Sequence, residues 1–308
     1  MKVAILGGTG FVGSYIVDAL VAAGHTPRVL VRSGSESKLR FADKCEIVHG
    51  DVEDGAAVAT CMEGCDAAIY NIGLLREFPE QGVTFEKMHY EGAVRAIDAA
   101  RSAGVGRFVL MSANGVKPDG VPYASTKFRA EEYLRSTDLD YTIFRPSVVF
   151  GDPRGRMEFC SQLTEEMILA PVPAPLFHEG MLPTGAGEFE LTPVFVEDVA
   201  QCFVRCLDEP ATYGKTYPLG GPDRVTWREI IDTLSRVVGK RKIKLPAPAW
   251  ALKAAGAVFD RYEWFPVTRD QLTMLLEGNV ADGSEAFQTL GIRPVRFTPA
   301  ALGYLARR

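Results

Sequence analysis

The chain has 308 residues, of which 47% are hydrophobic and 24% are charged, and its formal net charge is −5. This globular composition allows one large domain or two lobes, and the mild acidity argues against a general attraction to nucleic acid or anionic lipid. The first apolar run ends at Gly7, and no apolar stretch reaches the roughly 20 residues that cross a bilayer. We therefore expect no signal peptide or membrane span, and a cytoplasmic location.

Short apolar runs alternate with segments of helical periodicity through the first 146 residues. The predicted strands are residues 2–6, 28–31, 46–49, 67–71, 107–111 and 141–144. The predicted helices are residues 11–23, 55–62, 85–103, 123–135 and, later in the chain, 197–207. Buried strands separated by helices indicate a parallel sheet with helices on both faces, and the right-handed crossover rule makes it a doubly wound α/β sheet of the Rossmann type.

The pattern changes after Pro146, where the strict alternation ends and prolines crowd residues 171–193. Thr226 and Glu229 form a capping box that opens a predicted helix over residues 227–238. Shorter helices are expected near residues 248–259, 268–277 and 298–306.

These changes predict two domains. Residues 1–151 together with about 191–220 are expected to form a dinucleotide-binding Rossmann domain. Residues of about 152–190 together with 221–308 are expected to form a smaller C-terminal α/β lobe that contacts a substrate or partner.

Two pairs of cysteines, Cys61/Cys65 and Cys202/Cys206, are each four residues apart, a spacing that would put each pair on one face of a helix. Zinc and redox sites favour two intervening residues, so this spacing favours reduced core cysteines, and we expect no metal site.

A glycine-rich turn directly follows the first predicted strand and opens the first helix. Gly7 would allow the tight exit from the strand, Gly10 would let the backbone approach a pyrophosphate, and Gly13 would let the helix pack close to the sheet. The residues predicted to hold a dinucleotide here are Gly7, Thr9, Gly10, Phe11, Val12 and Gly13.

The end of the second strand bears on which dinucleotide is bound. NAD-specific sites usually carry an acidic residue there for the ribose hydroxyls, but this chain has Arg32, whose planar guanidinium suits a 2′-phosphate. We therefore predict that NADP(H) is preferred over NAD(H). A solvated charge at a strand end is the alternative interpretation of Arg32.

Two further strand ends supply candidates for the adenosine part of the cofactor. Asp51 and Val52 follow the third strand, where a side chain can reach the adenine amine, and Asn71, Ile72 and Gly73 close the fourth strand. Each of these could equally be a turn former.

Several separated motifs together resemble one family, the short-chain dehydrogenase/reductase superfamily, in its extended or atypical branch. Within that branch the chain is most similar to the nucleotide-binding accessory subunit of respiratory complex I and its bacterial relatives. The matching stretches are the glycine turn, Asp51, residues 107–112, 123–127, 144–151, 193–200, 219–222, 268–272 and 290–294.

The resemblance implies a catalytic pair, Tyr123 and Lys127, which lie four residues apart and so share one face of a helix. In active relatives the tyrosine exchanges a proton with the substrate oxygen, while the lysine holds the nicotinamide ribose and lowers the tyrosine pKa. Ser112 occupies the position of a hydroxyl that orients the substrate carbonyl, and Pro146 and Val149 those of nicotinamide contacts.

The chain departs from the family pattern in two places. Ala113 and Asn114 occupy positions where extended enzymes often place the useful hydroxyl, and His89 replaces a helical asparagine. These departures leave cofactor binding intact but make turnover itself a question.

The predicted second lobe has Arg154, Arg156 and His178 but no dense cluster typical of a diphosphate clamp. An aromatic segment that starts at Trp250 and includes Phe265 could line an apolar pocket or rest on a membrane or quinone-related partner, or be an ordinary core helix.

Three functions follow as hypotheses. The first is an NADP(H)-dependent oxidoreductase acting on a small carbonyl or quinone-like compound. The second is a non-catalytic NADPH-holding accessory or assembly protein of a respiratory or quinone-biosynthesis complex, peripheral to the inner face of the membrane. The third is a sugar-nucleotide epimerase.

Overall fold

The computed structural model describes residues 1–180, 182–250, 269–276 and 278–307. The chain divides into two compact units, which are described one at a time. The first unit contains Met1–Pro146, Val196–Leu219 and Gly283–Arg293, and the second contains Ser147–Phe195, Gly220–Asp282 and Pro294–Arg308.

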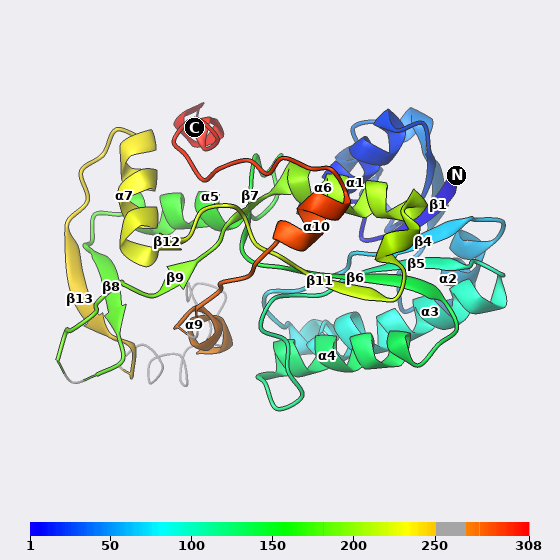
Figure 1. The fold of residues 1–308 in the computed structure, drawn as a ribbon, viewed down its shortest axis with the longest axis horizontal. Coiled ribbons are helices and arrows are strands. Elements are labelled where there is room, and N and C mark those ends of the chain that lie inside the picture. Colours follow the sequence, from blue (N-terminus) through cyan, green and yellow to red (C-terminus); the bar gives the residue numbers. More distant parts are fainter. Residues whose placement is uncertain (181, 251–268, 277, 308) are drawn as a thin grey trace. The chain divides into compact units, whose positions relative to one another are not determined.

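A seven-stranded parallel sheet forms the centre of the first unit, in the order β11-β6-β5-β4-β1-β2-β3 (Figure 1). Its strands are β1 (Lys2–Leu6), β2 (Thr26–Val31), β3 (Glu46–His49), β4 (Ala67–Tyr70), β5 (Arg107–Met111), β6 (Asp140–Pro146) and β11 (Lys215–Leu219). The doubly wound Rossmann-type fold predicted from the alternating pattern is confirmed.

Helices cover both faces of this sheet, as expected for parallel strands joined by right-handed crossovers (Figure 1). Helix α1 (Phe11–Ala22) packs against α6 (Val196–Arg205) on one face. On the other face α3 (Gly92–Ser102) packs between α2 (Gly55–Met62) and α4 (Pro122–Arg135). The predicted helix at 55–62 and the strands at 2–6, 46–49 and 107–111 have the predicted bounds.

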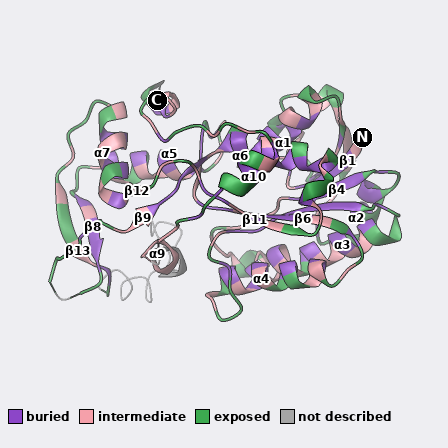
Figure 2. Cartoon of the chain, in the orientation of Figure 1, coloured by how far each residue is buried: buried purple, intermediate pink, exposed green. Residues whose placement is uncertain are grey.

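The core lies between the sheet and these helices. Every residue of the central strands β4 and β5 is buried, which explains why their sequences are continuous apolar runs rather than alternating ones (Figure 2). All six cysteines are unpaired thiols; five are buried and Cys45 is half-buried, as expected for small core residues.

The second unit is built from short two-stranded sheets and helices. Strand β8 (Ala174–His178) pairs with β13 (Lys244–Pro248), β9 (Glu190–Leu191) with β12 (Val225–Thr226), and β7 (Val149–Phe150) with β10 (Val194–Phe195). Its helices are α5 (Phe159–Leu163), η5 (Thr164–Ile168), α7 (Trp227–Val237) and α9 (Arg269–Leu276). The predicted capping box of Thr226 and Glu229 is present at the start of α7.

Several of the predicted bounds need correction. Residues 147–151 and 191–195 were predicted in the dinucleotide-binding domain but belong to the second unit. Residues 283–293 were predicted in the smaller lobe but belong to the first unit, where Arg205 donates to the carbonyl oxygens of Leu290 and Gly291 and helix α10 (Ser284–Thr289) packs on β11. The predicted helix at 298–306 is instead a turn followed by the 3-10 helix η8 (Gly303–Arg307).

Most of the predicted helix at 248–259, with the aromatic segment that follows Trp250, lies outside the described residues. In the part of the chain that the structure describes, no helix is both long enough and apolar enough to cross a membrane.

Candidate functional site

The glycine turn Gly7–Gly13 is packed so tightly that a side chain would clash with neighbouring backbone at two of its positions. Gly7 has a φ of +92°, and a Cβ there would lie 2.8 Å from the backbone of Asn71. A Cβ at Gly13 would lie 2.0 Å from the Gly7 carbonyl oxygen. At Gly10 the nearest atom to such a Cβ is 3.4 Å away, so the turn is open on that side. The turn has the shape that the sequence predicts for a backbone that approaches phosphates.

The N-terminus of α1 begins at this turn and carries no compensating charge. Gly10 is the N-cap residue and provides no side-chain cap, and the first turn contains no acidic residue. The amides of Phe11, Val12 and Gly13 therefore keep their partial positive charge, which favours an anionic group.

Arg32 lies at the end of β2, exposed, and makes no ion pair with any residue that the structure describes. Asp51 follows β3 and accepts a hydrogen bond from the Glu53 amide at 3.1 Å, which is the contact of a turn former. Val52 beside it is buried in the core. The roles predicted for these residues toward the adenosine stay predictions.

Residues at the end of β4 lie between the glycine turn and the predicted catalytic pair. Asn71 touches the Gly7–Gly13 turn, and a Cβ on Gly73 would lie 3.8 Å from the Lys127 amino group. Ile72, Ser112, Lys127 and the buried His89 then surround one space that is too small for a water molecule. The fold therefore brings together residues from the ends of β1, β4 and β5 and from helix α4.

Lys127 is buried on α4 and its Nζ donates to the Met111 carbonyl oxygen at 3.2 Å. Burial lowers the pKa of Lys127 to about 8, partly offset by the nearby carboxylate of Glu131. The amino group lies 5.8 Å from the centroid of the Tyr123 ring, so the pair does share one side of the helix.

Tyr123 is half-buried, and its ring meets Phe85 and His89 edge to face, with centroid distances of 5.7 and 5.1 Å. Burial raises the pKa of Tyr123 to about 12. The prediction that Lys127 lowers this pKa is wrong for the chain alone, because the phenol is desolvated among aromatic rings while the ammonium donates to Met111.

His89 holds this arrangement together. It is 2% exposed, its Nε2 accepts from the Leu74 amide at 2.9 Å, and its Nδ1 lies 3.3 Å from the Thr126 hydroxyl. Since the Thr126 hydroxyl donates to the Pro122 carbonyl oxygen, the hydrogen-bond pattern assigns the proton to Nδ1. Burial, followed by the charge of Lys127, lowers the pKa of His89 to about 2, so the ring is neutral.

The helix around His89 departs from the predicted one. Residues 86–91 form a π-helix, Glu86–Glu91, which joins α3 directly, whereas the periodicity predicts one α-helix over 85–103. Sequence reasoning identified His89 only as a departure from a family pattern. Its contacts to Leu74 and Thr126 span 15 and 37 residues, and no local signal predicts them.

Ser112 is buried at the end of β5, and its hydroxyl has no hydrogen-bond partner among the described residues. A buried hydroxyl without a partner is costly, so Ser112 keeps a hydrogen-bonding capacity that no described residue uses. Pro146 ends β6, where its carbonyl oxygen accepts from the Asn114 amide at 2.9 Å. Val149 is part of β7 in the second unit, and its predicted contact with the nicotinamide stays a prediction.

These observations test whether the residues fit a dinucleotide. The glycines form a cradle that a Cβ would fill, the first helix has an uncompensated N-terminus, and the Ser112 hydroxyl lacks a partner. The turn and the start of α1 therefore fit the pyrophosphate of a dinucleotide.

Comparison with known proteins agrees with this geometry. Residues 7–167 match the NAD(P)H-binding family. The 40 kDa subunit of the mitochondrial NADH-ubiquinone oxidoreductase of Neurospora crassa is 28% identical over 98% of this chain and 78% of its own length. The ceramide reductase of Caulobacter vibrioides is 30% identical over 84% of this chain and 78% of its own.

A solved structure shows the same fold at lower identity. The UDP-glucose 4-epimerase of Thermus thermophilus, in complex with NAD, aligns with a TM-score of 0.72 and 20% identity, covering 100% of this chain and 98% of that one. The matched residues include the whole glycine turn, Ser112 and the Tyr123/Lys127 pair. The chain therefore belongs to the NAD(P)H-binding family, as an atypical member of the short-chain dehydrogenase/reductase superfamily.

Proposed function

We propose that the protein is an NADP(H)-dependent oxidoreductase that reduces a small, largely apolar carbonyl or quinone-like compound. The observation that carries the proposal is the grouping of Lys127 and the unpartnered Ser112 hydroxyl beside Ile72 and Gly73, with Tyr123 adjoining through His89. A reductase among the relatives, which by its name acts on ceramide, supports an apolar substrate.

Each residue of the site would have its own role in the reduction. The amides that open α1 would hold the pyrophosphate, and Lys127 the nicotinamide ribose, while the bound cofactor supplies a hydride. The Ser112 hydroxyl would donate to the substrate oxygen and hold it in place. Tyr123 would give that oxygen its proton, completing the alcohol, and would regain a proton from solvent.

The proposed preference for NADP(H) rests on Arg32. Its guanidinium is exposed, has no ion-pair partner among the described residues, and stands at the strand end where an acidic residue would favour NAD. A fork of N–H donors at this place suits a phosphate on the adenosine ribose.

The test is NADPH oxidation measured over a panel of carbonyl and quinone compounds. Tyr123→Phe should lower kcat by at least about 100-fold without changing NADPH affinity, because only the proton donor is removed. Tyr90→Phe is the matched control, since Tyr90 is also half-buried but stacks under Arg129. Turnover that survives Tyr123→Phe would exclude this mechanism. Stabilisation by UDP-glucose in a thermal-shift assay would instead favour an epimerase.

One observation favours a second candidate function. The space beside Ser112 and Lys127 has no room for a water molecule, which suits a site that holds a nucleotide without admitting a substrate. The similarity to a complex I subunit supports an accessory or assembly protein of a respiratory or quinone-biosynthesis complex. Such a protein would lie on the cytoplasmic side, peripheral to the inner face of the membrane.

This second function predicts tightly retained NADPH that exchanges slowly, no turnover on any compound of the panel, and co-purification with membrane complexes. Rapid exchange of the nucleotide together with a monodisperse, partner-free protein would exclude it.

A further inference from the structure

The second unit carries a cluster of exposed aliphatic side chains outside the cofactor site. Leu169, Val172, Ile243 and Leu245 are 51, 57, 69 and 52% exposed. Single exposed apolar residues are common on protein surfaces, but adjacent ones mark a contact surface. The question is therefore whether these four are adjacent.

Two hydrogen bonds join the two segments that contain them. The Lys242 amino group donates to the Ala170 carbonyl oxygen at 2.5 Å, and the Ala174 amide donates to the Ile243 carbonyl oxygen at 2.8 Å. From there β13 runs parallel to β8, with Leu245 opposite Pro175. The four aliphatic residues thus lie on two segments that run side by side.

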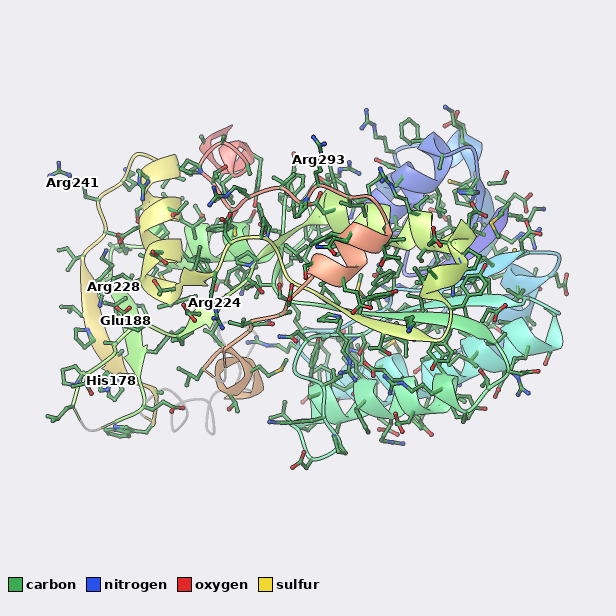
Figure 3. The ribbon with its side chains drawn as sticks, viewed as in Figure 1. His178, Glu188, Arg224, Arg228, Arg241 and Arg293 are labelled. Carbon is green, nitrogen blue, oxygen red and sulfur yellow. The ribbon has the colours of Figure 1, made fainter. Side chains whose placement is uncertain are left out.

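Basic residues lie next to these aliphatic residues in the sequence, where residues 240–244 are Lys-Arg-Lys-Ile-Lys. Lys244 is paired with Asp232. Lys240 and Arg241 are exposed and have no ion-pair partner in the described part of the chain, and Arg241 points away from the unit into solvent (Figure 3). The net charge of −5 describes the whole chain and conceals this local positive cluster. We call Leu169, Val172, Lys240, Arg241, Ile243 and Leu245 the β13 surface.

The strand itself argues against pairing with another chain. Pro246 and Pro248 remove two backbone N–H donors from β13, so this edge cannot continue the sheet into a partner. Cations beside aliphatic side chains suit instead the boundary between anionic headgroups and acyl chains.

We propose that the β13 surface binds an anionic lipid bilayer. Lys240 and Arg241 contact the headgroups, and Ile243, Leu245, Leu169 and Val172 enter the outer edge of the acyl region. The proposal gives a surface to the peripheral location named above, and it does not depend on whether Tyr123 turns over a substrate.

The experiment is co-sedimentation of the full chain, saturated with NADPH, with phosphatidylcholine vesicles that do or do not contain phosphatidylglycerol. Lys240→Gln/Arg241→Gln should weaken binding to the anionic vesicles at least about tenfold, since each cation near such a surface contributes favourably. The control Lys215→Gln/Arg293→Gln removes the same two charge types from exposed positions of the first unit and should leave binding unchanged.

A second variant, Ile243→Ser/Leu245→Ser, should also weaken binding while leaving its salt dependence in place. NADPH affinity is measured for each variant, and an unchanged affinity shows that the variant is folded. Loss of vesicle binding with unchanged NADPH affinity concerns this proposal alone, and not the cofactor function. The proposal is overturned if anionic vesicles do not bind the wild type at low salt, or if the two charge variants weaken binding equally. Capture by an acidic protein without vesicle binding overturns it as well.

Discussion

The glycine turn and the surroundings of Tyr123 both lie near the carboxyl ends of the parallel strands, but their packing differs. At the turn, space is made by leaving side chains out, and one added methyl group at Gly13 would meet the Gly7 carbonyl oxygen at 2.0 Å. Around Tyr123, space is filled by Phe85 and His89, which come from a different helix. The shape of the turn therefore depends on individual glycines, whereas the packing around Tyr123 depends on contacts between residues that are far apart in the sequence.

The largest effect is expected where the turn is tightest. Gly13→Ala should reduce NADPH affinity by at least about 100-fold, because α1 must shift away from the strand that positions its amides. The same change should destabilise the fold by about 1–3 kcal/mol. Titration of NADPH by fluorescence measures the first and urea unfolding the second. Gly106→Ala is the control, since a Cβ there meets nothing within 4 Å. Equal effects of the two variants would contradict the steric account.

A smaller effect on NADPH affinity is expected at Arg32, which lies at the end of β2. Arg32→Ala should weaken NADPH binding roughly 10- to 100-fold, the worth of charge-assisted hydrogen bonds to a phosphate, and should leave NADH binding unchanged. Parallel titrations with the two nucleotides distinguish the outcomes. A uniform loss for both would mean that Arg32 does not read the 2′-phosphate.

The packing around Tyr123 can be tested through the pH dependence of stability, because His89 is part of it. The pKa of His89 is about 2 in the folded chain, against an ordinary value of 6.5. The unfolded chain therefore binds the extra proton below pH 6.5, and the stability that this group contributes falls as pH falls. Between pH 6.5 and pH 5 the wild type should lose about 2 kcal/mol more unfolding free energy than His89→Asn. Urea unfolding at both pH values measures it, with the exposed His49→Asn as control. If His89→Asn keeps the wild-type slope, the ring is not held neutral.

The smallest effect is expected at Ser112. Removing a buried hydroxyl that has no partner, by Ser112→Ala, should raise the unfolding free energy by about 1 kcal/mol, because a desolvation cost disappears. If the hydroxyl serves the substrate, kcat should fall in the same variant. A loss of stability instead would show that Ser112 has a partner in solution.

The same contrast explains what the sequence could predict. Most strands of the Rossmann sheet and the glycine turn follow from local patterns, since β1, β4 and β5 are almost wholly buried apolar runs and the glycines follow β1 directly. Strand β11 was not predicted, because it is short, contains Pro218, and is recognised only by its pairing with β6. An edge position tolerates that proline.

At the site, the residues themselves could be predicted but their electrostatics could not. Tyr123, Lys127 and Ser112 follow from a family resemblance and from positions at the ends of elements. The raised pKa of Tyr123 and the neutral ring of His89 arise from burial between α4 and the π-helix. This packing arises only when α4 and the π-helix come together in the fold, and no local spacing of residues in the sequence predicts it.

The path of the chain has a consequence for how the protein is made. The polypeptide passes between its two units five times, after residues 146, 195, 219, 282 and 293. When the ribosome has released only the first 146 residues, β6 has no neighbour on its outer side, and β11 cannot cover it before residue 219 has emerged. An uncovered strand is prone to join other chains, so fragments that stop between these points should aggregate, and the nascent chain is most vulnerable in that interval.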